Sequence, residues 1–170
     1  KGDRMEDFHI LALSGGGYKG LYTAQVLANI EEQFKCPVAQ KFDLIAGTSI
    51  GGILAIALAL EIPASEMVNL FMEEGEKIFS PQYFSFKGVL RSKYSQNGLK
   101  NALEKKFGDK TIGDLKHRVI IPTVNFTKGG PQIIKTRHHE TFVTDPSKRL
   151  VDVALMTSAA PIVFPIHKTA

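Results

Sequence analysis

One serine in this sequence lies at a turn between an apolar segment and a long apolar helix pattern. Ser49 is the centre of Gly47-Thr48-Ser49-Ile50-Gly51, which joins Leu44–Ala46 to an Ala, Leu and Ile run ending at Leu60. A strand, a sharp turn and a buried helix around Gly-x-Ser-x-Gly are typical of a nucleophile elbow. The free N–H groups and the dipole at a helix start favour negative charge. Ser49 is therefore a candidate nucleophile for acyl transfer, although a serine that only caps its helix is the alternative.

A glycine-rich loop precedes this serine by about thirty residues. Gly15, Gly16 and Gly17 lie between the apolar run Phe8–Leu13 and a helical pattern, and their N–H groups could converge as an oxyanion hole requires. The spacing Gly15-x-Gly17-x-x-Gly20 also matches the dinucleotide-binding pattern, whose acidic partner follows about 20 residues later at the end of a strand. Asp43 lies instead near the beginning of the second strand. A dinucleotide-binding oxidoreductase nevertheless remains an alternative at this point.

The elements around these two motifs predict how they meet. Phe8–Leu13 and Phe42–Ala46 have the pattern of buried strands, each followed by a helical pattern, and Cys36-Pro37 ends the first helix. This β-α-β-α order predicts a parallel sheet with covering helices. Because parallel strands end at the same sheet edge, we expect the glycine loop and Ser49 to lie side by side. Together they predict an anion cradle beside an exposed serine.

The rest of the chain predicts further helices and strands within one domain. Thr111 to Asp114 has capping-box spacing, and Pro122 inside a strand pattern suggests a bulge or an edge. Ser80 to Asn97 is aromatic and basic, and we interpret it as a packed surface loop, with a lid as the alternative. The remaining expected elements are a helix from Pro63, a helix over Gly98–Phe107, strands over Arg118–Phe126 and Gln132–Thr136, and a helix over Asp145–Ser158.

Composition sets limits on the class of protein. The 170 residues carry a net charge of +4, which mildly favours anionic surfaces such as phospholipid headgroups but is too weak to indicate nucleic-acid binding. The single cysteine, Cys36, excludes an internal disulfide and fits a reducing compartment. The polar start, Lys1 to Asp7, has no apolar segment of the kind that signal peptides carry. The run ending at Leu60 is shorter than the roughly 20 residues of a membrane span.

No histidine is an evident general base for Ser49. A Ser-Asp-His hydrolase would place its acid and then its histidine after the serine. His138 and His139 lie in a polar turn beside Arg137 and Glu140, and His9 lies in or beside the first strand. The others are His117 and His167.

Three ordered motifs resemble the patatin-like phospholipases over almost the whole chain. Gly15-Gly16-Gly17-Tyr18-Lys19-Gly20 matches the family's oxyanion loop, with Lys19 as its basic residue and Gly20 as its last glycine. Gly47-Thr48-Ser49-Ile50-Gly51 matches its elbow, and Thr157-Ser158-Ala159-Ala160-Pro161 matches its third motif. The resemblance implies a three-layer α/β/α domain with a mainly parallel central sheet. It also implies a Ser-Asp dyad that cleaves lipid acyl esters without a histidine, metal or cofactor.

The chain departs from this family at one point. The Asp-Gly dipeptide that carries the catalytic aspartate does not occur, since Gly113-Asp114 has the reverse order and lies too early. We therefore expect residues 1–170 to be a patatin-like domain truncated at its C-terminal end, with the aspartate beyond Ala170. Such a fragment should be inactive alone. A non-catalytic lipid-binding domain is the alternative if the aspartate is absent altogether.

The resemblance also suggests a narrower role. Bacterial members include antiviral effectors that a cyclic nucleotide activates and that then degrade the cell's own membrane. On this hypothesis the protein is cytoplasmic, touches the inner face of the membrane, and has phospholipid as substrate and a cyclic nucleotide as activator. Oligomer formation is compatible with it. Nothing in these 170 residues identifies a nucleotide site.

Overall fold

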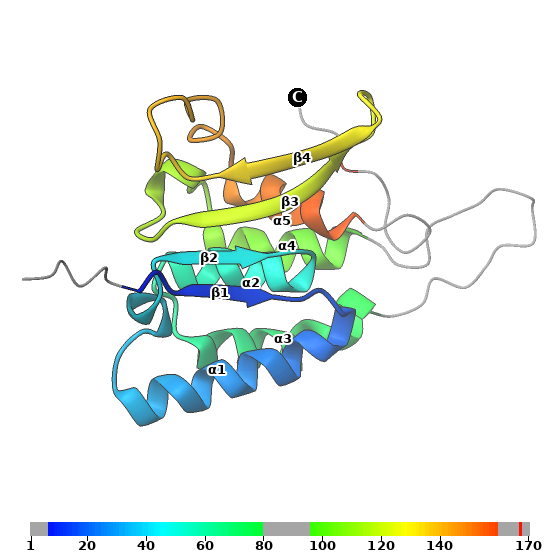
Figure 1. Cartoon of the computed structure of the whole chain (residues 1–170). Coiled ribbons are helices and arrows are strands. Elements are labelled where there is room, and N and C mark those ends of the chain that lie inside the picture. The colour runs from blue at the N-terminus through cyan, green and yellow to red at the C-terminus, as the bar shows by residue number, and fades with distance from the viewer. Residues whose placement is uncertain (1–6, 80–95, 160–166, 168–170) are drawn as a thin grey trace, which may run out of the picture.

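The computed structural model describes residues 7–79, 96–159 and 167. Four strands form one sheet in the order β1-β2-β3-β4, in which β1, β2 and β3 are parallel and β4 is antiparallel to β3 (Figure 1). The predicted fold class, an α/β domain with a mainly parallel central sheet, is confirmed. The strands are β1 (Ile10–Leu13), β2 (Leu44–Gly47), β3 (Val119–Asn125) and β4 (Gly130–Lys135).

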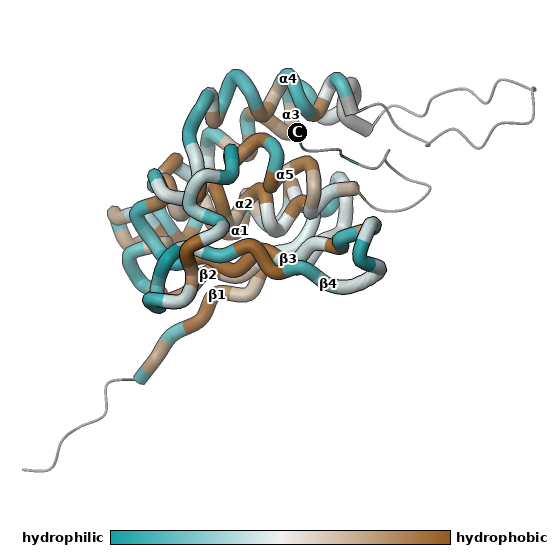
Figure 2. Tube along the Cα trace, turned by 90° about the horizontal axis from the view of Figure 1, so that it is seen from above, coloured by the Kyte–Doolittle hydropathy of each residue, from teal (hydrophilic) through white to brown (hydrophobic). Residues whose placement is uncertain are grey.

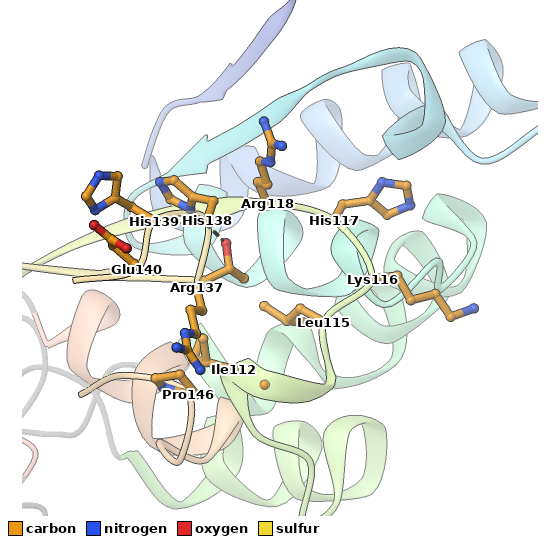
Figure 3. A pocket seen from close by; sticks show the side chains of 12 residues that line it. Ile112, Leu115, Lys116, His117, Arg118, Arg137, His138, His139, Glu140 and Pro146 are labelled. Atoms are coloured by element: carbon orange, nitrogen blue, oxygen red, sulfur yellow. Dashed lines mark hydrogen bonds between the residues drawn. The ribbon is translucent and has the colours of Figure 1, made fainter. Parts of the chain in front are cut away.

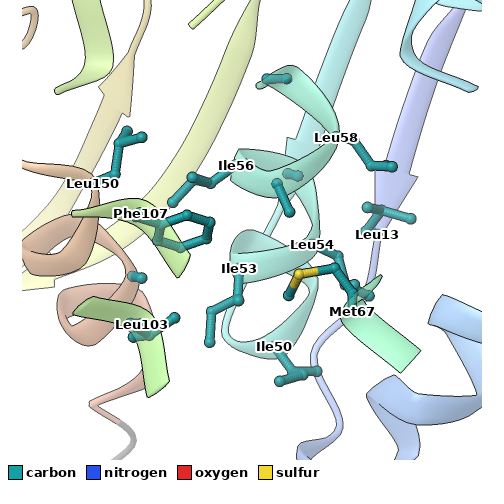
Figure 4. Close-up of a cluster of buried hydrophobic side chains, with 14 of the residues drawn as sticks. Leu13, Ile50, Ile53, Leu54, Ile56, Leu58, Met67, Leu103, Phe107 and Leu150 are labelled. Carbon is teal, nitrogen blue, oxygen red and sulfur yellow. The ribbon is translucent and has the colours of Figure 1, made fainter. Parts of the chain in front are cut away.

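The described helices pack around one central helix. All ten residues of α2 are buried, and α2 contacts β2, β3 and α5 (Figure 4). Its side chains meet Leu13 of β1, Phe107 of α4 and Leu150 of α5 in one apolar cluster. The α-helices are α1 (Gly20–Phe34), α2 (Ile50–Ala59), α3 (Ala64–Phe79), α4 (Gln96–Phe107) and α5 (Leu150–Ser158), and the short 3-10 helices are η1 (Gly17–Lys19), η2 (Val38–Lys41) and η3 (Ile112–Asp114).

The two faces of the sheet differ in burial. Alternate side chains, including Ile45, Val119 and Ile121, point toward the helices and are fully buried, while Val124 and Ile133 on the other face are 74% and 48% exposed. Figure 2 shows the apolar strands beside the helices, with α2 and α5 next to the sheet. This alternation follows from the period of two along a strand.

Local sequence signals explain most element ends. The capping box predicted at Thr111 is present, with the Asp114 carboxylate accepting the Thr111 N–H at 2.7 Å. α1 ends at Phe34, and its C-cap residue, Lys35, has a left-handed backbone (φ 55°) two residues before Pro37. None of the helices in the described part of the chain has the length and apolar character that crossing a membrane requires.

Two structural predictions were wrong in part. α5 begins at Leu150 and not at Asp145, because the Asp145 carboxylate accepts the N–H of Lys135 and its carbonyl accepts the N–H of Lys148 in a preceding turn. Pro122 causes no bulge, since β3 and β4 pair in unbroken register. The pairing of β2 with β3 ends at Ile120, so the strand neighbour on that side stops before the proline.

The predicted loop or lid over Ser80 to Asn97 falls outside the described residues, apart from its last two residues, which begin α4. It remains a prediction. Ala160 and Pro161, the last two residues of the third motif, also fall outside the described residues.

Candidate active site

Ser49 occupies a strained turn between β2 and α2. Its backbone angles are φ 55° and ψ −128°, a region that residues with a side chain rarely adopt. Ser49 is the N-cap residue of α2, but its side chain makes no capping hydrogen bond, so capping does not explain the serine. Such strain costs about 1–3 kcal/mol and tends to occur at functional sites. A half-buried serine on a strained strand-to-helix turn has the form of a nucleophile elbow.

Glycines make this turn sterically feasible. A Cβ at Gly47 would collide with the carbonyl of Gly51, and a Cβ at Gly51 would collide with the carbonyl of Leu13. A Cβ at Gly20 would collide in the same way with the side chain of Ile50, the residue after the serine. The motif glycines therefore let the end of β1 and the start of α1 approach the start of α2 closely.

The glycine loop lies directly beside the serine, as the sheet topology predicts. A Cβ at Gly15 would lie 3.0 Å from the Cβ of Ser49 and 3.2 Å from the carbonyl oxygen of Thr48. The N–H groups of Gly15, Gly16, Gly17 and Ile50 have no hydrogen-bond acceptor among the described residues. Unpaired N–H groups at a helix start can bind an anion. Four such donors thus lie in the two segments that meet at Ser49.

A third element holds the elbow from the other side. The backbone N–H of Ser49 donates to Thr157 Oγ1 at 3.0 Å, and that hydroxyl donates to the carbonyl oxygen of Pro122 at 2.8 Å. Thr157 lies near the end of α5, where its methyl group also approaches Gly52. The sequence motif that contains Thr157 gave it no role, because the partner residue is 108 positions away. A hydroxyl in the last turn of the helix, next to the hydroxyl of Ser158, was the only signal.

The described residues bring no general base to Ser49. The Ser49 hydroxyl has no hydrogen-bond partner among them, and the histidines are engaged elsewhere. His117 pairs with Glu61 at 3.2 Å, and His167 with Asp152 at 3.0 Å. His138 bonds to Thr136, while His9 and His139 are exposed. No cluster of metal-ligating side chains occurs within the described ranges.

The remaining motif residues are peripheral. Lys19 ends η1, is exposed, and forms no ion pair with any residue that the structure describes. Asp43 lies before β2, at the opposite sheet edge from the glycine loop, and its carboxylate accepts the N–H of His9 at 2.8 Å. A dinucleotide site needs its carboxylate at the glycine-loop edge. Asp43 therefore cannot complete the dinucleotide pattern.

Comparison with known proteins decides the family. A family model described as Patatin-like phospholipase matches residues 11–170. The chain belongs to the patatin-like phospholipases. This patatin-like chain is 51% identical to a cGAMP-activated phospholipase of Pseudomonas aeruginosa, over 95% of its own length and 49% of the relative's. It is 41% identical to a protein of that name from Vibrio cholerae, over 93% of its own length and 49% of the relative's.

A solved structure supports the same fold. VipD from Legionella pneumophila superposes with a TM-score of 0.55 at 15% identity, over 94% of this chain and 43% of VipD. At that identity the likeness concerns the fold alone. The patatin-like chain spans about half the length of the curated relatives that it matches.

Proposed function

We propose that the whole protein is a phospholipase that cleaves fatty-acyl esters of membrane phospholipids, with Ser49 as its nucleophile. The contact between Gly15 and Ser49 carries this proposal, because it brings N–H donors that have no acceptor among the described residues beside a half-buried hydroxyl on a strained turn. Family membership supports the reaction class. The oxidoreductase alternative loses its basis, since Asp43 lies at the wrong sheet edge.

In this mechanism the Ser49 hydroxyl attacks the ester carbonyl. An aspartate beyond Ala170 accepts the serine proton, and the N–H groups of Gly15, Gly16 and Gly17 stabilise the oxyanion. Each well-placed donor contributes about 10²–10³ in rate. The alcohol leaves, an acyl-enzyme remains on Ser49, and water then releases the fatty acid. Histidine has no part in this dyad, which accords with the distribution of histidines around the fold.

We also propose that a cyclic dinucleotide activates the protein. Three relatives that are 38–51% identical bear the name cGAMP-activated phospholipase, which supports such an activator. A role in antiviral defence is part of the same proposal. Activity against the cell's own lipids would require a cytoplasmic protein that contacts the inner face of the membrane. The net charge of +4 favours that anionic surface. An oligomer is compatible with the proposal.

The test replaces the serine in the full-length protein. Ser49→Ala should abolish both fatty-acid release from phospholipid vesicles in the presence of cGAMP and labelling by a fluorophosphonate. Ser147→Ala, in an exposed turn before α5, is the matched control and should keep both. Fatty-acid release that survives Ser49→Ala would refute the nucleophile. A wild-type protein that binds vesicles but neither labels nor releases fatty acid would favour the non-catalytic alternative.

A further inference from the structure

A basic hollow lies at the sheet edge opposite to Ser49. It has a volume of about 770 Å³, within the range of roughly 300–1,000 Å³ typical of small-molecule sites. Its walls are the segment leading into β3, with Leu115 and Arg118, and the segment leaving β4, with Thr136 and Arg137 (Figure 3). Substrate sites of parallel α/β sheets lie at the carboxyl ends of the strands. This hollow lies where β3 begins, so it is separate from the candidate active site.

The charge of the hollow is positive and incompletely paired. Arg118 and Arg137 are both exposed and have no carboxylate partner among the described residues. In Figure 3 their side chains extend in opposite directions. Lys116 is less available, because it pairs with Glu61 at 2.7 Å. Glu140 is the one carboxylate in the lining.

The pKa of His138, which also lines the hollow, is lowered mainly by burial and in part by nearby positive charge. Burial, followed by the nearby charges of Arg118 and Lys135, lowers the pKa of His138 below its usual value of 6.5. The neutral ring bonds to the hydroxyl of Thr136 at 3.2 Å. An anion bound in the hollow would relieve this accumulation of positive charge.

The lining combines two features of a nucleotide site. Each guanidinium can donate two parallel hydrogen bonds to a phosphate, and its planar face can stack on an aromatic ring. Leu115 and Pro146 add an apolar part to the lining, suited to the face of a base. We propose that the hollow binds the phosphodiesters of a cyclic dinucleotide through Arg118 and Arg137. This inference rests on the proposed activation by such a nucleotide.

The elements that line the hollow lead directly to the serine. The carbonyl of Arg118 accepts the N–H of Ile45 at 2.9 Å, and β2 continues from Ile45 to the elbow. Along β3, the carbonyl of Pro122 accepts the hydroxyl of Thr157, which in turn accepts the N–H of Ser49. Displacement of β3 by a bound nucleotide would therefore reach the backbone of the nucleophile.

The test measures binding apart from catalysis. Full-length protein carrying Ser49→Ala is titrated with cGAMP by calorimetry, alone and with Arg118→Gln and Arg137→Gln added singly and together. Each arginine change should weaken cGAMP binding at least ~10-fold, since a hydrogen bond to a charged group is lost. Glu140→Gln should strengthen it. Lys128→Gln, an exposed cation in the β3–β4 turn, is the matched control and should leave the affinity unchanged.

A second arm separates the two sources of phosphodiester. The same variants are measured for binding to phosphatidylglycerol vesicles without nucleotide. Unchanged cGAMP affinity in the double arginine variant would overturn the inference, and weaker vesicle binding alone would assign the hollow to lipid headgroups instead. Absence of cGAMP binding by the Ser49→Ala protein would also overturn it. If the wild-type protein releases no fatty acid but cGAMP binding still depends on both arginines, only the proposed hydrolase activity is refuted.

Discussion

Replacing Thr157 with valine tests whether the elbow must be held from α5. Valine keeps the shape of threonine but removes the acceptor for the Ser49 N–H at 3.0 Å and the donor to Pro122 at 2.8 Å. Each hydrogen bond contributes about 0.5–1.5 kcal/mol net, so the turn loses roughly 1–3 kcal/mol of support. This is about the size of the strain that a residue with positive φ stores. The valine variant should therefore let Ser49 relax from its productive position.

The expected kinetic effect follows from that energy. A loss of about 1–3 kcal/mol shifts the balance between productive and relaxed turns by roughly 5- to 150-fold, since 1.36 kcal/mol corresponds to a factor of ten. A misplacement of about 1 Å costs a similar amount in rate. We expect Thr157→Val to slow fluorophosphonate labelling of Ser49 by about 10- to 100-fold in the full-length protein. With phospholipid as substrate, the loss of activity should be mainly in kcat and not in KM, because the substrate contacts are retained.

Two further variants separate positioning from stability. Thr157→Ser keeps the hydroxyl and should restore most of the labelling rate. Thr123→Val removes a comparable bond, from the Thr123 hydroxyl to the Gln132 carbonyl at 2.8 Å, but does not touch the elbow. It should lower the thermal midpoint without slowing the labelling of folded protein. If Thr157→Val labels at the wild-type rate, or Thr123→Val slows labelling equally, the positioning argument is refuted.

Two other changes test local features. Gly15→Ala would place a Cβ 3.0 Å from the Cβ of Ser49, so the rate of fluorophosphonate labelling should fall roughly 10-fold or more. Gly130→Ala is the control, because a Cβ there meets open space and should not change the labelling rate. Equal labelling rates in the two variants would contradict the close contact. Bonds from Gln40, Lys116 and His117 lower the pKa of Glu61 from 4.5 to about 2. The ionised carboxylate therefore stabilises the fold above pH 4.5, and that stabilisation is lost as the pH falls toward 2. Chemical unfolding should show that Glu61→Gln has a lower free energy of unfolding than the wild type, by an amount that shrinks as the pH falls from 4.5 toward 2. A difference in the free energy of unfolding that does not depend on pH would exclude this linkage.

The site residues were predictable where their constraints are local in sequence. Gly47 and Gly51 flank the serine that they accommodate, and their steric role follows from a turn of five residues. The contact between Gly15 and Ser49 followed from one further rule, that neighbouring parallel strands end at the same edge. Local pattern and topology were sufficient for this half of the site.

The rest depended on contacts between distant segments. Thr157 meets Ser49 across 108 residues of sequence, and no periodicity marks it. The start of α5 was misplaced because Asp145 resembles a helix cap but its carboxylate bonds to β4. The basic hollow joins residues before β3 to residues after β4, so Arg118 and Arg137, which have no carboxylate partner among the described residues, line one hollow only in the fold. Side-chain partners over such separations are set by packing and not by local propensity.

The elbow and the hollow are connected by two links of different kinds. The first is β2 itself, which pairs with β1 along its full length and leads covalently into Ser49. Moving it would disturb a buried ladder, so it is the stiff link. The second is the Thr157 hydroxyl, a single rotatable group between the Pro122 carbonyl and the Ser49 N–H. A small displacement of β3 could break this bond at a cost of about 1 kcal/mol without unpairing a strand. Thr157 is therefore the point at which a ligand in the hollow would most readily affect the geometry of the serine.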